Sequence, residues 1–142
     1  MKNDIKNYIM IPDEKWETFL KIAFDYSDYF SLKYSINEEW YDDSLCEYLR
    51  INLSKWHILD KDESVWPEYE KEHYDCNFFT MKIIASIESI SKMGNNIYPE
   101  DLSFFKKDIA WFENISHEKI SFFKSADLKL QNELLQNGIS FI

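Results

Sequence analysis

The stretch "YPEDLSFFKKDIAWFENISHEKISFF", residues 98–123, carries the pattern that decides the fold. The runs DLSFF (101–105), DIAWFENI (108–115) and EKISFFK (118–124) are rich in aromatic and β-branched residues, which favour strands. Only short breaks, KK and SH, separate them, and breaks of this length are typical of antiparallel hairpins. The stretch therefore predicts three neighbouring antiparallel strands.

Helical spacing precedes and follows these strands. A first helix is predicted after Pro12, because apolar residues recur at i, i+3, i+4, i+7 and i+8. A second is predicted after YDD, where Asp42 or Asp43 can cap it, and a last one after Asp127, ending at Gly138. The apolar residues assigned to these three helices are Trp16, Phe19, Leu20, Ala23 and Phe24; Leu45, Tyr48, Leu49, Leu53 and Trp56; and Leu128, Leu134 and Leu135.

The middle of the chain contains both the alternation typical of strands and the spacing typical of helices. Alternation from Phe30 to Ile36 predicts a strand, residues 60–75 are interpreted as a charged loop, and CNFFTM (76–81) as a short strand. KIIASIESISKMG (82–94) is predicted to be a helix, although its β-branched residues also fit a strand. We therefore expect an α+β fold, with a mainly antiparallel sheet packed by about four helices.

The composition indicates one domain. The chain has 142 residues with only two glycines and three prolines, so no flexible linker divides it, and residues 1–142 are predicted to form a single domain. No segment approaches the ~20 apolar residues of a membrane span, and no signal-peptide run opens the sequence. We expect a cytoplasmic protein without membrane contact, whose two cysteines are reduced.

The charge limits the classes of partner. Twenty-six acidic residues against sixteen basic ones give a net charge of −10, and Arg50 is the only arginine. Nucleic-acid recognition relies on arginine and on basic patches, so nucleic acid is excluded as a partner. An acidic surface instead favours a basic partner and speeds its association.

No pattern of catalytic or metal-binding residues is complete. Cys46, His57, His73 and Cys76 are four potential zinc ligands, but they form no CxxC or HxxxH pair, and both cysteines are explained as buried residues. There is no GxSxG motif and no glycine-rich phosphate loop. We therefore predict no metal site and no cofactor.

His117 with Glu118 is the sharpest candidate for acid–base chemistry, with Asp101 as another possible carboxylate. Neighbouring residues on a strand point to opposite faces, so the two side chains are not expected to share a pocket unless the turn distorts the strand. The favoured interpretation is that the His117 ring bonds to the backbone at a hairpin turn, and that Asp101 accepts N–H groups at another turn.

Four segments resemble a pattern in small uncharacterised bacterial proteins: WPEYE, YPEDLSFF, AWFENISHEKISFF and the closing LLQNGISFI. Here Glu68 follows Pro67 where that pattern has glycine. Such proteins are similar to the immunity proteins that accompany polymorphic toxins. The resemblance implies a cytoplasmic, non-enzymatic binder of a cognate toxin.

The leading hypothesis is therefore a non-enzymatic protein that presents carboxylates and aromatic rings to a basic partner. An enzyme using His117, or a homodimer formed through an edge strand, stays an alternative. Trp40 and Tyr41 could equally pack beneath the second helix. The predicted contact residues are Trp40, Tyr41, Asp42, Asp43, Glu68, Tyr69, Glu70, Glu72 and Glu113.

Overall fold

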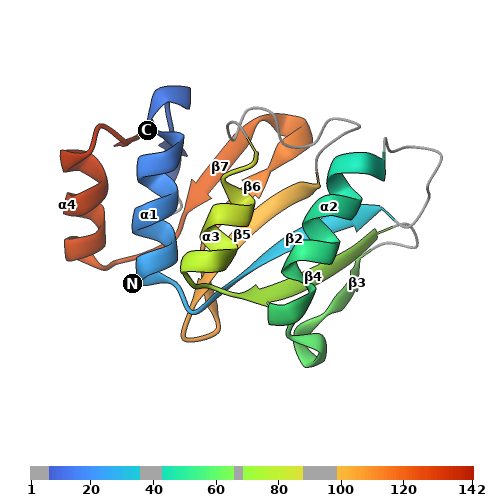
Figure 1. Cartoon of the computed structure of the whole chain (residues 1–142). Helices are drawn as coiled ribbons and strands as arrows, with labels where there is room; N and C mark the ends of the chain where they lie inside the picture. Colours follow the sequence, from blue (N-terminus) through green and yellow to red (C-terminus); the bar gives the residue numbers. More distant parts are fainter. Residues whose placement is uncertain (1–6, 36–42, 66–68, 88–98) are drawn as a thin grey trace.

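An eight-stranded antiparallel sheet organises the chain (Figure 1), in the order β3-β4-β2-β5-β6-β7-β1-β8. The computed structural model describes residues 7–35, 43–65, 69–87 and 99–142. The fold is α+β with four α-helices in these ranges, as the sequence predicts. The strands are β1 (Asn7–Met10), β2 (Tyr29–Ser35), β3 (Glu63–Val65), β4 (Tyr69–Asp75), β5 (Glu100–Lys106), β6 (Ile109–Ile115), β7 (Ile120–Phe123) and β8 (Ser140–Phe141). The helices are α1 (Trp16–Tyr26), α2 (Asp43–Leu53), α3 (Phe78–Ile84) and α4 (Leu128–Gln136).

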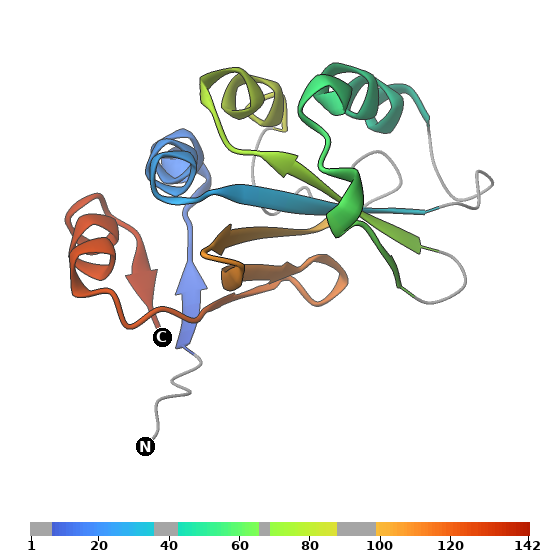
Figure 2. The ribbon, with the colours of Figure 1, turned by 90° about the horizontal axis from the view of Figure 1, so that it is seen from below.

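The helices cover one face of the sheet. Figure 2 shows α1, α2 and α3 over this face, while α4 packs beside α1 near β8. The amphipathic stripe of α1 places Phe19 against Phe104 and Phe112, and Trp16 donates a 2.7 Å hydrogen bond from Nε1 to the carbonyl of Ile87. The predicted first helix is thus confirmed, and it anchors the core.

The meander β5–β6–β7 confirms the three predicted hairpin strands. Phe104, Phe112 and Phe123 lie opposite one another across the three strands and are buried in the core. The preceding residue of β5, Ser103, and the following residue, Phe105, point to the helix-free face, where the Phe105 ring stacks on Tyr29 at 4.6 Å. Aromatic residues therefore serve both faces.

Both turns of the meander contain left-handed residues. Lys107 and Asp108 have φ values of 51° and 65° and form the two-residue turn between β5 and β6. At the other end, a 3-10 turn (Ser116–Glu118) leads to Lys119, whose φ is 58°. Hairpin turns of the first kind usually carry Asn-Gly, so a Lys-Asp turn is held in place by other contacts.

Two predictions between residues 60 and 81 are wrong. The expected loop contains β3 and β4, and the expected strand CNFFTM contains the start of α3. Asn77 starts this helix, because its side chain accepts the N–H of Thr80 while the Thr80 hydroxyl accepts the N–H of Asn77. The helix predicted over 82–94 begins earlier and ends at Ile84, and residues 88–94 lie outside the described ranges.

The helices after α1 are confirmed with corrections to their inner faces. In α2, Leu49 and Leu53 are fully buried, whereas Tyr48 is exposed. In α4, which Asp127 caps as predicted, the buried residues are Leu130 and Leu134. Leu128 and Leu135 are exposed, since positions 130 and 134 already fill the face toward α1. Trp56 lies beyond α2 in a 3-10 turn, η3 (Ser54–Trp56).

Strand β1 is shared between two neighbours. Asn7 and Tyr8 pair with β7, while Ile9 and Met10 pair with β8. The N–H of Ile142 also donates to the carbonyl of Tyr8 at 2.8 Å. None of the described helices is long and apolar enough to cross a membrane.

Candidate functional site

One end of the sheet forms an open hollow of about 750 Å³, which we call the acidic hollow. Segments far apart in the sequence meet there: the start of β2, the 3-10 turns after α2, the end of β4 and the β5–β6 turn. The lining residues are Asp28, Tyr29, His57, Ile58, Leu59, Asp60, Lys61, Asp75, Lys107 and Asp108. Four carboxylates face two lysines, so two negative charges are uncompensated when His57 is neutral.

Asp108 joins the β5–β6 turn to the opposite wall of the hollow. Its Oδ1 accepts a 2.8 Å hydrogen bond from the Tyr29 hydroxyl and a 3.0 Å bond from Lys61 Nζ. The Lys61 ammonium also lies 4.8 Å above the Tyr29 ring. The hydrogen bonds from Lys61 and then Tyr29 hold the pKa of the Asp108 carboxyl below its usual value. These contacts explain how a turn without glycine is stabilised.

Asp28 connects the same turn to β4. Its Oδ2 accepts the N–H of Lys107 at 2.7 Å, and its carbonyl accepts the N–H of Cys76 at 3.1 Å. By contrast, Asp60 and Asp75 are exposed, and their carboxylates make no hydrogen bond or ion pair within the described ranges. Two of the four carboxylates are therefore free to meet cations outside the chain.

Exposed aromatic rings continue the surface beside the acidic hollow. Trp56 stacks on Phe79 with a centroid separation of 5.8 Å, and Phe79 contacts Phe78 at 6.0 Å. We call these three residues the aromatic ladder. Phe78 and Phe79 are 59% and 62% exposed. The ladder adjoins the hollow through the backbone, since Trp56 precedes His57 and Phe78 follows Asp75 by three residues.

A buried polar cluster supports the wall of the hollow. Glu72 accepts a 2.6 Å bond from Arg50 at Oε2 and another 2.6 Å bond from the Tyr74 hydroxyl at Oε1. The Tyr74 hydroxyl lies 3.1 Å from that of Tyr34. Burial alone would raise the pKa of Glu72, but the bonds from Arg50 and Tyr74 outweigh it and lower this pKa. Burial raises the pKa of both tyrosines.

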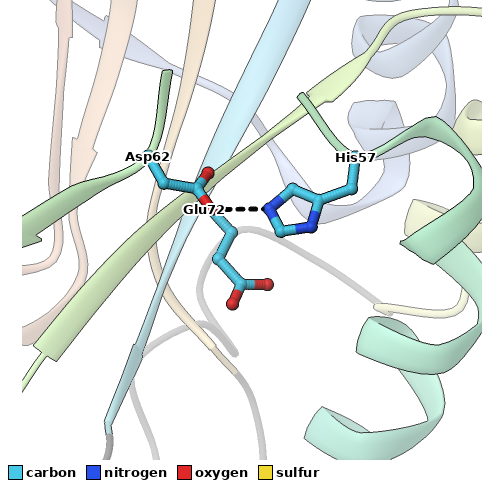
Figure 3. Close-up of side chains that lie close together, drawn as sticks. All are labelled: His57, Asp62 and Glu72. Carbon is cyan, nitrogen blue, oxygen red and sulfur yellow. Dashed lines mark hydrogen bonds and ion pairs between the residues drawn. The ribbon is translucent and has the colours of Figure 1, made fainter. Parts of the chain in front are cut away.

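His57 connects this cluster to the hollow. Its Nε2 lies 2.8 Å from Asp62 Oδ2, and its ring lies 5.2 Å from the Tyr74 ring (Figure 3). Asp62 Oδ1 accepts the backbone N–H of His73 at 3.1 Å. Figure 3 shows the His57 ring and the carboxylates of Asp62 and Glu72 turned toward a common space. Their ligand atoms lie within 4.8 Å of one another.

The predicted contact residues fall into three groups. Glu72 is 8% exposed and paired with Arg50, which corrects the expectation that it lies at the surface. Glu113, half-buried, pairs with Lys124. Tyr69 and Glu70 are half-buried in β4, with the ammonium of Lys33 4.6 Å from the Tyr69 ring. Trp40, Tyr41, Asp42 and Glu68 lie outside the described residues, as does the side chain of Asp43 at the start of α2.

The turn at His117 is an exposed corner. The His117 side chain is 65% exposed, and its Nε2 lies 3.7 Å from Glu118 Oε2. Within the described ranges the ring bonds to no backbone group, because the 3-10 turn directs it outward together with Glu118. The expected bond from the His117 ring to the backbone is therefore not found there. Asp101 lies in strand β5 and not in a turn of its own, which corrects that expectation; it accepts the N–H of Ser116 from the 3-10 turn at 2.8 Å and pairs with Lys33 at 2.8 Å. Catalysis by His117 with Glu118 stays an untested alternative.

The four potential zinc ligands do not converge. Among the described residues the single group of ligand atoms is His57, Asp62 and Glu72, which contains neither cysteine. Cys46 is buried in α2, and burial raises the pKa of the Cys76 thiol, which disfavours its thiolate form.

The carboxylates of the hollow were not identified from the sequence. Asp28, Asp75 and Asp108 each lie at the start or end of a strand, and antiparallel pairing brings those ends together. These carboxylates could have been identified from the sequence as acidic residues at the start of one predicted strand and the end of its antiparallel neighbour. No protein-family model, curated protein or solved structure matches the chain.

Proposed function

We propose that this protein is a non-enzymatic binder of a basic protein, of the kind that neutralises a cognate bacterial toxin. One observation carries the proposal: the acidic hollow, whose Asp60 and Asp75 are unpaired within the described ranges, is connected through the backbone to the partly exposed aromatic ladder. Buried aromatic rings supply most of the affinity in protein interfaces, and complementary charge speeds association.

The proposed surface differs from the one suggested by the sequence. Glu72 and Glu113 are already paired inside the chain, so a partner would have to break those ion pairs. A partner that binds Asp60 and Asp75 would not have to break an ion pair within the described ranges. Leu59, which is 75% exposed on the same hollow, adds apolar area beside them.

The test is co-expression with the product of the neighbouring gene. We expect rescue of growth and a complex that survives gel filtration. The double variant Asp60→Asn/Asp75→Asn should slow association several-fold at low salt, and Phe79→Ala should raise Kd at least about tenfold. Glu118→Gln, which removes an exposed charge at the other end of the meander, is the matched control.

Two results would contradict the proposal. The first is the absence of both rescue and a complex. The second is a loss in Glu118→Gln that equals, per charge removed, the loss in the double variant, which would mean that only the net charge matters. The mass of the free protein in solution checks the alternative of a homodimer.

A further inference from the structure

We propose that His57, Asp62 and Glu72 form a binding site for a divalent first-row transition metal. This site goes beyond the proposed binding function and does not depend on it. The ligand atoms of the three residues lie within 4.8 Å of one another (Figure 3). One imidazole with two carboxylates forms a donor set suited to Zn²⁺ and less suited to Mg²⁺ or Ca²⁺.

The positions of the ligands need only small changes. Zinc binds nitrogen and oxygen at about 2.0–2.2 Å, so two ligands of a tetrahedral site lie roughly 3.3 Å apart. His57 Nε2 and Asp62 Oδ2 are 2.8 Å apart, and a metal between them would replace that hydrogen bond. Glu72, which is buried, would have to approach, and its carboxylate is turned toward the same space.

The contacts of Glu72 hold its carboxylate in place, and both of its oxygens can still accept a further contact. Arg50 and Tyr74 each bond to one oxygen, and a carboxylate oxygen can accept more than one contact. Hydrogen bonds of this kind commonly orient metal ligands. The charges also fit, because two carboxylates face one arginine and the cluster is left with one negative charge when His57 is neutral.

His73 lies outside the site. Its ring packs against Tyr29 and Phe105 on the helix-free face, because neighbouring residues of β4 point to opposite faces. Its Nδ1 lies 3.8 Å from Asp62 Oδ1, which is too far for a hydrogen bond, and it does not belong to the group of ligand atoms around His57.

The site is accessible. His57 lines the acidic hollow, and the side chains of His57 and Asp62 are 19% and 21% exposed. A metal could enter from the hollow, and the turns that carry His57 and Asp62 would then be tied to β4. Binding should therefore stabilise the wall of the hollow.

The experiment is calorimetric titration of chelator-treated, full-length protein with Zn²⁺ alone. We expect one bound ion per chain and a rise in Tm in the presence of excess Zn²⁺. His57→Ala and Asp62→Asn should each weaken binding by tenfold or more. His117→Ala is the matched control, because it removes the other histidine beside a carboxylate, and it should leave the affinity unchanged.

Co²⁺ provides a second readout that needs no variant. Four-coordinate Co²⁺ absorbs visible light, and a thiolate ligand adds an intense near-ultraviolet band that nitrogen and oxygen ligands do not give. We expect the visible absorption without the thiolate band. The proposal is overturned by a thiolate band, by the absence of stoichiometric binding, or by binding that persists in both His57→Ala and Asp62→Asn.

Discussion

The two ends of the β5–β6–β7 meander differ in how they are held. At the Lys107–Asp108 end, a turn binds to Tyr29, Lys61 and Asp28 from other parts of the chain. At the His117–Glu118 end, Ser116 ties the turn to Asp101 of β5, whereas the His117 and Glu118 side chains are exposed and contact each other. A conspicuous local motif can therefore lie at an exposed corner, while the candidate surface is assembled from residues that are unremarkable in the sequence.

The largest predicted effect concerns the support of the hollow. Glu72→Ala would leave Arg50 and the Tyr74 hydroxyl without their shared acceptor, and we expect a loss of about 3 kcal/mol in the free energy of unfolding. Glu118→Ala should change it by less than about 0.5 kcal/mol. Urea denaturation measures both. Equal losses would show that the buried cluster behind the hollow contributes no more to stability than the exposed corner does.

A smaller effect is expected from the link across the hollow. Tyr29→Phe removes the hydroxyl that donates to Asp108, and should destabilise the protein by about 1 kcal/mol. Tyr8→Phe is the control, because Tyr8 is exposed on β1 and contacts Phe122 through its ring. If both variants unfold at the same urea concentration as the parent protein, the link contributes nothing.

The two residues of the β5–β6 turn should respond differently to glycine. Lys107→Gly relieves a left-handed conformation and should stabilise the protein by roughly 0.5 kcal/mol, since its contact to Asp28 is made by the backbone and survives the change. Asp108→Gly gains the same relief but loses the bonds to Tyr29 and Lys61, so it should not stabilise. Thermal unfolding compares them. A stabilised Asp108→Gly variant would contradict this account of the turn.

The smallest effect is a dependence on pH. The pKa of Asp108 is lowered in the folded protein, so its contribution is complete above the ordinary aspartate pKa of about 3.9 and is lost as the pH falls through the folded value. The difference in Tm between the parent protein and Asp108→Asn should therefore shrink below pH 4. A difference in Tm that stays constant down to pH 2 would show that the charge of Asp108 does not contribute to stability.

The sequence predicted the fold class because the decisive patterns are local. The stripe of α1 and the three strands of the meander repeat at the period of their own element, and the structure confirms them. Strand β4 was missed because Glu70 and Glu72 occupy positions that face the helices. Glu72 is buried there only because Arg50, twenty-two residues away, neutralises it. Such a strand looks like a charged loop until its partner is known.

The candidate site was less predictable because its residues, too, depend on partners that are distant in the sequence. His57 and His73 were considered as zinc ligands together with the cysteines, whereas the structure places them around Asp62. Three positions of the hollow, Asp28, Asp75 and Asp108, come together only through the order of the strands. The sequence around these three residues does not indicate the order of the strands.

The division of β1 between β7 and β8 affects the timing of folding. The partner of Ile9 and Met10 is made about 130 residues later. At typical rates of synthesis of 5–20 residues per second, this delay is roughly 7–25 s. Throughout that interval half of β1, including the apolar Ile9, has no strand to pair with, so the earliest strand of the sheet is also among the last to be completed on the ribosome.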